Sequence, residues 1–208
     1  MRIITVSRQF GSGGRELGKR LAEILGWDYY DKGILQQLSE ESGFNPEYVS
    51  TLISGHEWRN VHLSYNNTFS SILAFEPGMK TSLLVRQREI IEDIAKAGND
   101  FIIVGRDADV ILRDYRPFRI FVCADMDYRI DRCMNHENKK DEKERLSEKE
   151  VVRNIKKIDS SRAQSRELVT GKSWADSTCF DLTVNTGGRD IPKLAQAVAD
   201  YTLRWFEL

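Results

Sequence analysis

The sequence predicts an α/β protein built on a five-stranded parallel sheet. Short apolar runs alternate with amphipathic helical patterns along most of the chain, as expected when each strand is joined to the next by a crossover helix. The first apolar run also leads into a glycine-rich turn and then a helix. The 208 residues suit a single domain, residues 1–208, with insertions, because two full domains would be a tight fit.

Each apolar run is predicted as a strand and each amphipathic stretch as a helix. The strands are Ile3–Val6, Asp28–Tyr30, Phe101–Val104, Arg119–Val122 and Phe180–Val184. The helices lie near residues 15–25, 31–42, 79–97, 126–138, 148–168 and 190–206. Leucine and isoleucine side chains in the first of these helices share one face, which predicts a buried stripe. Start and stop signals, Pro77-Gly78 and Gly98-Asn99, flank the third.

Two segments interrupt this alternation. Residues 44–78 carry several aromatic side chains in a polar, turn-prone setting, and we expect a helical insertion that forms a small subdomain or a contact in a homodimer. Residues 135–150 are charged almost throughout. Such a run is typical of a solvated helix end, but it also stands where a mobile lid over residues 135–168 would begin.

The turn after the first strand is the strongest functional signal. It reads V-S-R-Q-F-G-S-G-G-R-E-L from Val6 to Leu17. A glycine-rich turn between a strand and a helix N-terminus lets backbone N–H groups converge on an anion, and the helix dipole adds to the attraction. The alternative is an ordinary connection without a ligand. We predict a phosphate site formed by Gly11, Ser12, Gly13, Gly14 and Arg15.

This turn departs from the P-loop pattern G-x-x-x-x-G-K-[ST]. Arg8 stands at the first glycine, Gly14 at the lysine, and Arg15 at the serine or threonine. Glu16 follows on the first helical turn, and its carboxylate would repel a triphosphate unless Mg²⁺ intervenes. Either Arg8 or Arg15 could replace the charge of the missing lysine.

Charged residues also surround the third predicted strand. Arg106 and Asp107 follow it directly, at the edge of the sheet where ligands bind in open α/β folds. Asp107 could instead cap the next helix. Lys80, Arg86 and Arg88 form a basic set on the helix before the strand. Arg86 and Arg88 cannot share a helical face, so at most one of the two points into a cleft.

A later helix carries a second set of charges. Asp159, Arg162 and Arg166 are spaced i, i+3 and i+7, so they share one helical face. Phosphoryl transfer spreads negative charge over the transferring oxygens, and arginines on a closing element can stabilise that charge. Exposed arginines are common, however, and a purely solvated face is the alternative.

Composition excludes several other classes of function. The net charge is −1, so no global field would recruit nucleic acid or a membrane surface. No signal peptide is recognised, and no apolar stretch approaches the roughly 18 residues of a membrane span. The three cysteines are scattered and the three histidines lie far apart. We therefore expect no metal-ligating set, reduced thiols and a cytoplasmic location.

Five short motifs occur in the order found in bacterial cytidylate kinases. They are G-S-G-G at 11–14, D-K-G at 31–33, L-V-R-Q-R at 84–88, G-R-D at 105–107 and D-x-x-R at 159–162. The segment S-R-x-x-G-S-G-G at residues 7–14 resembles the first motif of the cytidylate kinase-like family of P-loop proteins. The similarity spans nearly the whole chain and weakens through residues 44–78.

The resemblance implies a doubly wound sheet of order 2-3-1-4-5, a phosphate loop, an acceptor-binding region and an arginine-bearing lid. We expect the insertion at 44–78 to lie on the acceptor side. ATP phosphates would lie on Gly11–Gly14, with Mg²⁺ as cofactor, and Arg8 would supply the missing cation because it belongs to the family motif. The acceptor would meet Asp31, Lys80, Arg86, Arg106 and Asp107. The catalytic candidates are Arg8, Asp159, Arg162 and Arg166.

The expected function is transfer of the γ-phosphoryl group of ATP to a small acceptor, with a nucleoside monophosphate such as CMP as the leading acceptor. A different small acceptor is the first alternative, because residues 44–78 do not match the acceptor subdomain of cytidylate kinases. The second alternative is a catalytically inactive nucleotide-binding sensor or assembly protein. Glu16 is the sequence feature that favours this second alternative.

Overall fold

The computed structural model describes residues 1–31, 77–105, 107–137 and 145–208. The side chains of residues 77–84, 86 and 137 also lie outside the description. The predicted helix at 31–42 and the insertion at 44–78 therefore fall almost entirely outside the described residues. Residues 138–144 of the predicted lid region lie outside them as well.

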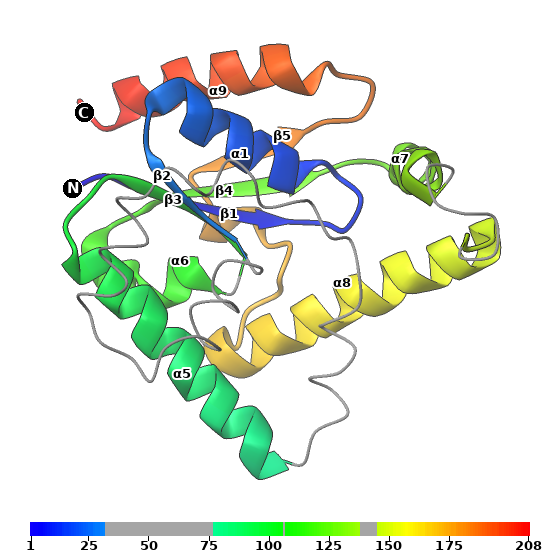
Figure 1. Ribbon diagram of the computed structural model, residues 1–208, viewed down its shortest axis with the longest axis horizontal. Coiled ribbons are helices and arrows are strands. Elements are labelled where there is room, and N and C mark those ends of the chain that lie inside the picture. Colours follow the sequence, from blue (N-terminus) through cyan, green and yellow to red (C-terminus); the bar gives the residue numbers. More distant parts are fainter. Residues whose placement is uncertain (32–76, 106, 138–144) are drawn as a thin grey trace.

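Five parallel strands form one sheet in the order β2-β3-β1-β4-β5, which confirms the predicted fold class and strand order (Figure 1). The strands are β1 (Ile3–Arg8), β2 (Asp28–Tyr30), β3 (Phe101–Val104), β4 (Phe118–Cys123) and β5 (Leu182–Asn185). In the central strand, Val6 pairs with Val104 on one side and Ile120 on the other. Strand order reverses at β1, so the C-terminal end of β1 is the expected ligand site.

Helices cover both faces of the sheet. Figure 1 shows α1 and α9 on one side, α5, α6 and α8 on the other, and α7 beyond the C-terminal end of β4. The helices are α1 (Gly14–Leu25), α5 (Pro77–Lys96), α6 (Ala108–Ile111), α7 (Met126–Glu137), α8 (Glu148–Thr170) and α9 (Ile191–Trp205). Short 3-10 turns occur at η2 (Arg113–Tyr115) and η4 (Ser177–Cys179). No helix in the described ranges is long and apolar enough to cross a membrane.

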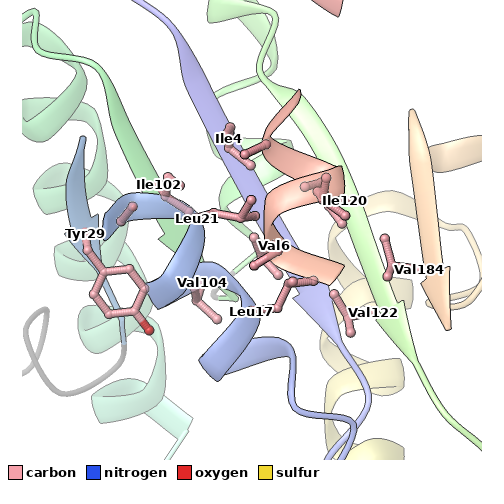
Figure 2. Packing of buried hydrophobic residues seen from close by; sticks show 14 of the residues in the cluster. Ile4, Val6, Leu17, Leu21, Tyr29, Ile102, Val104, Ile120, Val122 and Val184 are labelled. Carbon is pink, nitrogen blue, oxygen red and sulfur yellow. The ribbon is translucent and has the colours of Figure 1, made fainter. Parts of the chain in front are cut away.

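The larger core lies between the sheet and the helices α1 and α9. Leu17 and Leu21 of α1 are fully buried against strand residues that include Val6 and Val104 (Figure 2). Gly18 allows this close approach, because a Cβ atom there would lie 2.8 Å from a methyl group of Val104. The three central strands β1, β3 and β4 place buried apolar residues on both faces, as expected where helices cover both sides of a sheet. The rigid sheet thus holds the start of α1 directly above the end of β1.

The predicted elements within the described residues agree with the structure to within a few residues. The largest shift at a strand start is at β5, which starts at Leu182 rather than Phe180. Phe180 is the C-cap of η4, and Asp181 binds Arg119 through both its carboxylate and its backbone N–H. These contacts hold the chain beside β4 before regular strand pairing begins.

Candidate active site

The glycine-rich loop joins β1 to α1 at the C-terminal edge of the sheet, and its backbone is tied to neighbouring strands. The N–H of Gln9 donates to the carbonyl of Val122 (2.9 Å), and its side-chain oxygen accepts from the N–H of Ala124 (3.1 Å). Thr186, after β5, donates its hydroxyl to the carbonyl of Ser12 (2.6 Å). The ends of two neighbouring strands, β4 and β5, therefore hold the loop in place where it leaves β1.

Glycines are needed at the turn of the loop. Gly11 and Gly13 have φ angles of 79° and 78°, a left-handed conformation that other residues adopt only at a cost. A Cβ atom on Gly13 would lie 2.5 Å from Ile191 of α9. Gly13 is also the N-cap of α1, and no side chain caps the helix there. The predicted phosphate site lies at this helix N-terminus, whose first N–H groups have no side-chain cap, and anion binding there stays a prediction.

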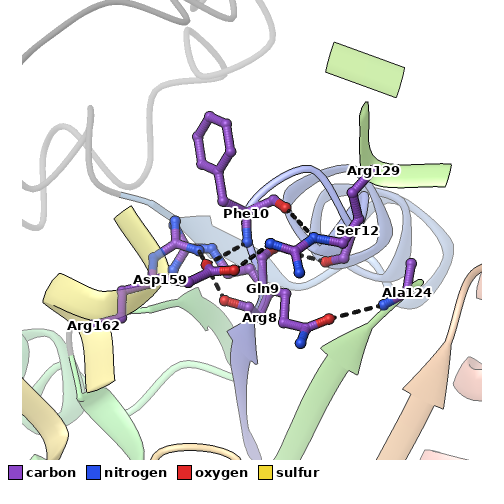
Figure 3. A network of polar contacts seen from close by, with 8 residues as sticks. All are labelled: Arg8, Gln9, Phe10, Ser12, Ala124, Arg129, Asp159 and Arg162. Carbon is purple, nitrogen blue, oxygen red and sulfur yellow. Dashed lines mark hydrogen bonds and ion pairs between the residues drawn. The ribbon is translucent and has the colours of Figure 1, made fainter. Parts of the chain in front are cut away.

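A network of charges connects α7 and α8 to this loop (Figure 3). The carboxylate of Asp159 on α8 accepts from the N–H of Phe10 (2.8 Å) and pairs with Arg129 of α7. Arg129 also donates to the carbonyl of Phe10 (2.7 Å). Arg162 donates to the carbonyl of Arg8 (2.9 Å) and lies 3.4 Å from Asp159. Asp159 and Arg162, which were predicted as lid residues, therefore contact the glycine-rich loop, and their catalytic roles stay predictions.

Arg166 shares the predicted face of α8 but contacts a different part of the molecule. It pairs with Asp109 of α6 at 2.6 Å, and the two side chains are only 5% and 3% exposed. The guanidinium also lies 5.7 Å from the ring centre of Phe180. This buried pair joins α8 to α6 below the loop, so the geometry favours a structural role. The predicted catalytic role of Arg166 stays a prediction.

Asp107 lies near the same contact between α6 and α8. It is the N-cap of α6 with a φ of 50°, and its side chain does not cap that helix. Its carboxylate instead accepts a hydrogen bond from Ser165 of α8 (2.9 Å). The side chain of Asp107 therefore does not cap α6, although the sequence suggested that role as an alternative. The acceptor-binding role of Asp107 stays a prediction.

Asp31 and Arg15 form a pair at the β2 end of the site. The carboxylate of Asp31 is buried and accepts from two guanidinium nitrogens of Arg15, at 2.5 and 2.6 Å. The hydroxyl of Tyr29 lies 3.5 Å from the same carboxylate, and burial raises the pKa of Tyr29 above its ordinary value. Arg15 therefore faces the edge of the sheet formed by β2 and β3.

Arg8 lies at the end of β1 between these groups. Its side chain passes Gly14, and its guanidinium lies against Gly105 at the end of β3. Part of the residue is accessible to solvent, yet the charged group is surrounded closely enough that burial lowers its pKa. Among the described residues, Arg8 has no hydrogen-bonded or ion-paired partner for its guanidinium, although the charges of Asp31 and Asp159 act on it from a distance.

Two arginines of α7 contribute to the site and were missed from the sequence. Besides Arg129, Arg132 lies beside Gly13, where its Cζ would be 3.4 Å from a Cβ atom on that glycine. It pairs with Glu16 at 2.5 Å, and Arg20 pairs with the same carboxylate at 2.9 Å. Burial alone would raise the pKa of Glu16, but these arginines lower it below its ordinary value.

The positions of these arginines carried a usable signal. The helix at 126–137 follows the C-terminal end of a central strand, so its first turns must lie close to the loop. Arg129 and Arg132 are spaced i, i+3 on it, which places them on neighbouring positions of one face. Three predicted acceptor residues cannot be placed in the same way: Arg106 lies outside the described residues, as do the side chains of Lys80 and Arg86 on α5.

The described residues do not fit a preformed Mg²⁺ site. P-loop proteins place a serine or threonine hydroxyl on the metal, but the corresponding residue here is Arg15, which pairs with Asp31. The carboxylates of Glu16 and Asp159 are also paired with arginines. Within the described ranges, no three candidate metal-ligating side chains gather at one point. Mg²⁺ therefore stays a prediction, and it would have to arrive on the phosphates of a nucleotide.

The sheet order and the glycine loop at the N-terminus of α1 define the class of P-loop kinases. Shikimate kinases from Acinetobacter baumannii, solved with shikimate, and from Bacteroides thetaiotaomicron share this fold. Their TM-scores are 0.51 and 0.54, their sequences are 13% and 12% identical, and the matches cover 98% and 100% of this chain and 94% and 99% of theirs.

The family profile described as Cytidylate kinase-like matches residues 3–188, so the chain belongs to the cytidylate kinase-like family. A cytidylate kinase from Haloarcula marismortui is 26% identical over 206 residues, which is 99% of this chain and 89% of that protein. An uncharacterised protein from Eubacterium ventriosum has a TM-score of 0.70 at 23% identity, covering 97% of this chain and 98% of that one. Family and fold together support a phosphotransferase of the nucleotide kinase type.

Proposed function

We propose that this protein transfers the γ-phosphoryl group of ATP to a small acceptor, and that a nucleoside monophosphate such as CMP is the leading acceptor. One observation carries the proposal: the uncapped N-terminus of α1 opens from a rigid glycine loop, and four arginines from β1, α7 and α8 surround that loop. They are Arg8, Arg129, Arg132 and Arg162. Phosphoryl transfer needs mainly position and positive charge of this kind.

The proposed reaction divides naturally between the two sides of the loop. The N–H groups of the loop and of the first turn of α1 hold the phosphates of ATP. The acceptor approaches from the ends of β2 and β3, where Asp31 and Arg15 lie. A phosphate oxygen of CMP forms the new bond to the γ-phosphorus while the bond to ADP breaks. That oxygen is already ionised at neutral pH, so the step requires no general base.

The comparisons support this proposal without selecting the acceptor. The relative from Haloarcula marismortui is named a cytidylate kinase, which favours CMP. An acceptor other than a nucleoside monophosphate stays the alternative, because the segment expected to bind the acceptor, residues 44–78, lies largely outside the described residues. A cytoplasmic location and a homodimer stay predictions.

A catalytically inactive sensor is less well supported than an enzyme. Its main argument was repulsion between Glu16 and a triphosphate. In the structure, Glu16 pairs with both Arg132 and Arg20, so its negative charge is balanced by two positive ones. The first turn of α1 therefore does not present a bare carboxylate to a phosphate.

Two measurements test the proposal. Isothermal titration of the full chain with ATP, with and without Mg²⁺, tests nucleotide binding. ADP release is then followed with CMP, dCMP, UMP, AMP and a panel of small alcohols that includes shikimate. We expect ATP to bind and CMP to give the fastest turnover. Faster turnover with an alcohol would show that the acceptor is an alcohol rather than a nucleoside monophosphate. Binding of ATP without turnover on any acceptor would support the inactive nucleotide sensor.

A further inference from the structure

The two arginines nearest the loop glycines lie beside different residues of the site. Arg132 lies beside Gly13, which also lies close to Ile191 at the start of α9. Arg8 lies beside Gly14, its guanidinium reaches Gly105 at the end of β3, and the charge of Asp31 acts on it.

The side chain of Arg8 occupies space that a residue at position 14 would need. A Cβ atom on Gly14 would lie 2.6 Å from the Cβ of Arg8 and 3.1 Å from its Cγ. A Cβ atom on Gly105 would lie only 1.7 Å from Nη1 of Arg8. Gly14 and Gly105 thus both lack side chains where Arg8 passes. An arginine at position 8 and a lysine at position 14 exclude each other in this backbone.

Glu16 orients Arg132 but leaves it accessible to solvent. The side chain of Arg132 is 35% exposed, and its guanidinium lies 2.5 Å from the carboxylate of Glu16, directly beside Gly13, the N-cap of α1. A phosphate on the helix N-terminus would therefore meet Arg132 at the surface. Arg8 has no such anchor among the described residues and lies deeper, between the loop and the ends of β2 and β3. The two cations are suited to different phosphate groups.

We infer that the charge of the missing P-loop lysine is divided between two arginines. Arg132 binds the donor phosphates that rest on α1, and Arg8 faces the phosphoryl group that moves toward the acceptor. This inference rests on the proposed function for the role of Arg8 in transfer. The role of Arg132 in anion binding depends only on the loop. The two side chains have different neighbours, Glu16 and Gly13 for Arg132 and Gly14 and Gly105 for Arg8, and this observation separates their roles.

Binding of tripolyphosphate and of ATP to the full chain tests the division. Arg132→Met should weaken both affinities by about tenfold or more, as expected for loss of one charged hydrogen bond. Arg8→Met should change both by less than about threefold, yet lower kcat by about 100-fold or more. Arg204→Met, which removes an exposed charge in the last turn of α9, is the control and should leave every value unchanged.

A second set of variants tests the spatial exclusion. Gly14→Lys alone should lower activity, because its side chain meets that of Arg8. The double variant Arg8→Gly with Gly14→Lys should recover at least tenfold over Gly14→Lys, since it removes the Arg8 side chain and gives positions 8 and 14 the residues of the ordinary P-loop pattern. Circular dichroism and the thermal midpoint of each variant check that it is folded. A double variant that stays folded but recovers nothing would contradict the exclusion.

The outcomes separate this inference from the proposed function. If the parent chain binds tripolyphosphate but transfers no phosphoryl group, the proposed function fails and the affinities of the Arg8 and Arg132 variants still decide the division. Equal losses of affinity in both variants would overturn the division even in an active enzyme. A greater loss in the Arg8 variant than in the Arg132 variant would reverse the two roles.

Discussion

The end of β1 and the contact between α6 and α8 each enclose an arginine, and the two regions treat that charge differently. At the α6–α8 contact, Arg166 is neutralised by Asp109, and both side chains are buried. At the end of β1, Arg8 has no ion-paired partner among the described residues, and burial lowers its pKa. A buried charge is costly unless it is paired. The pair at α6–α8 therefore suits structure, whereas the unpaired cation beside the loop suits an anionic ligand.

The largest effect is expected from Arg162, which reaches the end of β1 from α8. Arg162→Ala should lower activity by about 10³-fold or more, by analogy with other phosphoryl-stabilising arginines, with kcat and kcat/KM falling together. Thermal unfolding should barely change. Steady-state kinetics with a saturating acceptor provide the test, and Arg162→Lys is the conservative control. A large loss of stability with normal activity per folded molecule would show that Arg162 is structural.

The Asp109–Arg166 pair should affect the stability of the fold more than the activity. Asp109→Ala would leave Arg166 buried without a partner, which typically costs about 3–5 kcal/mol. Urea denaturation should therefore show a lower free energy of unfolding. The double variant Asp109→Leu with Arg166→Met should regain most of this loss, because a well-packed apolar pair can replace a buried ion pair. If Asp109→Ala were as stable as the parent, the Asp109–Arg166 pair would not have the structural role proposed for it.

Arg8 should show the reverse behaviour. Arg8→Met keeps the length of the side chain and removes a partly buried charge that has no ion-paired partner among the described residues, so we expect the free energy of unfolding to stay the same or rise by about 1 kcal/mol. The same urea titration measures this change. A clear loss of stability would mean that Arg8 has a structural role like that of Arg166, and the contrast between the two regions would disappear.

The smallest effect concerns the half-exposed cluster of Glu16 with Arg132 and Arg20. The two arginines lower the pKa of Glu16 below its ordinary value of 4.5. Its contribution to stability is therefore present above about pH 4.5 and is lost as the pH falls through the folded-state pKa. Glu16→Gln should cost less than about 1 kcal/mol at pH 7. The difference from the parent should shrink as the pH falls below about 4.5, and a difference that stays constant with pH would contradict this electrostatic origin.

Local patterns were enough to predict most of the fold. The strands are short apolar runs separated by amphipathic helices, and this alternation depends only on which residues can be buried. The loop at Gly11–Gly14 was predicted from its position between a strand and a helix, and in the structure Gly11 and Gly13 have the positive φ angles that glycine adopts readily. The strand order came with the resemblance to a known family and is confirmed by the structure.

Partners across the fold were decided by tertiary structure alone. The i, i+3, i+7 spacing placed Asp159, Arg162 and Arg166 on one face, but only packing sends the first two to the loop and the third to Asp109. The same holds for Arg132, which sequence reasoning missed because it meets Glu16 and Gly13 across more than a hundred residues. Helical periodicity specifies the direction of a side chain around its own axis. The partner that the side chain meets depends on how the sheet brings distant segments together. This packing therefore determines whether an arginine is neutralised by a carboxylate or left for a ligand.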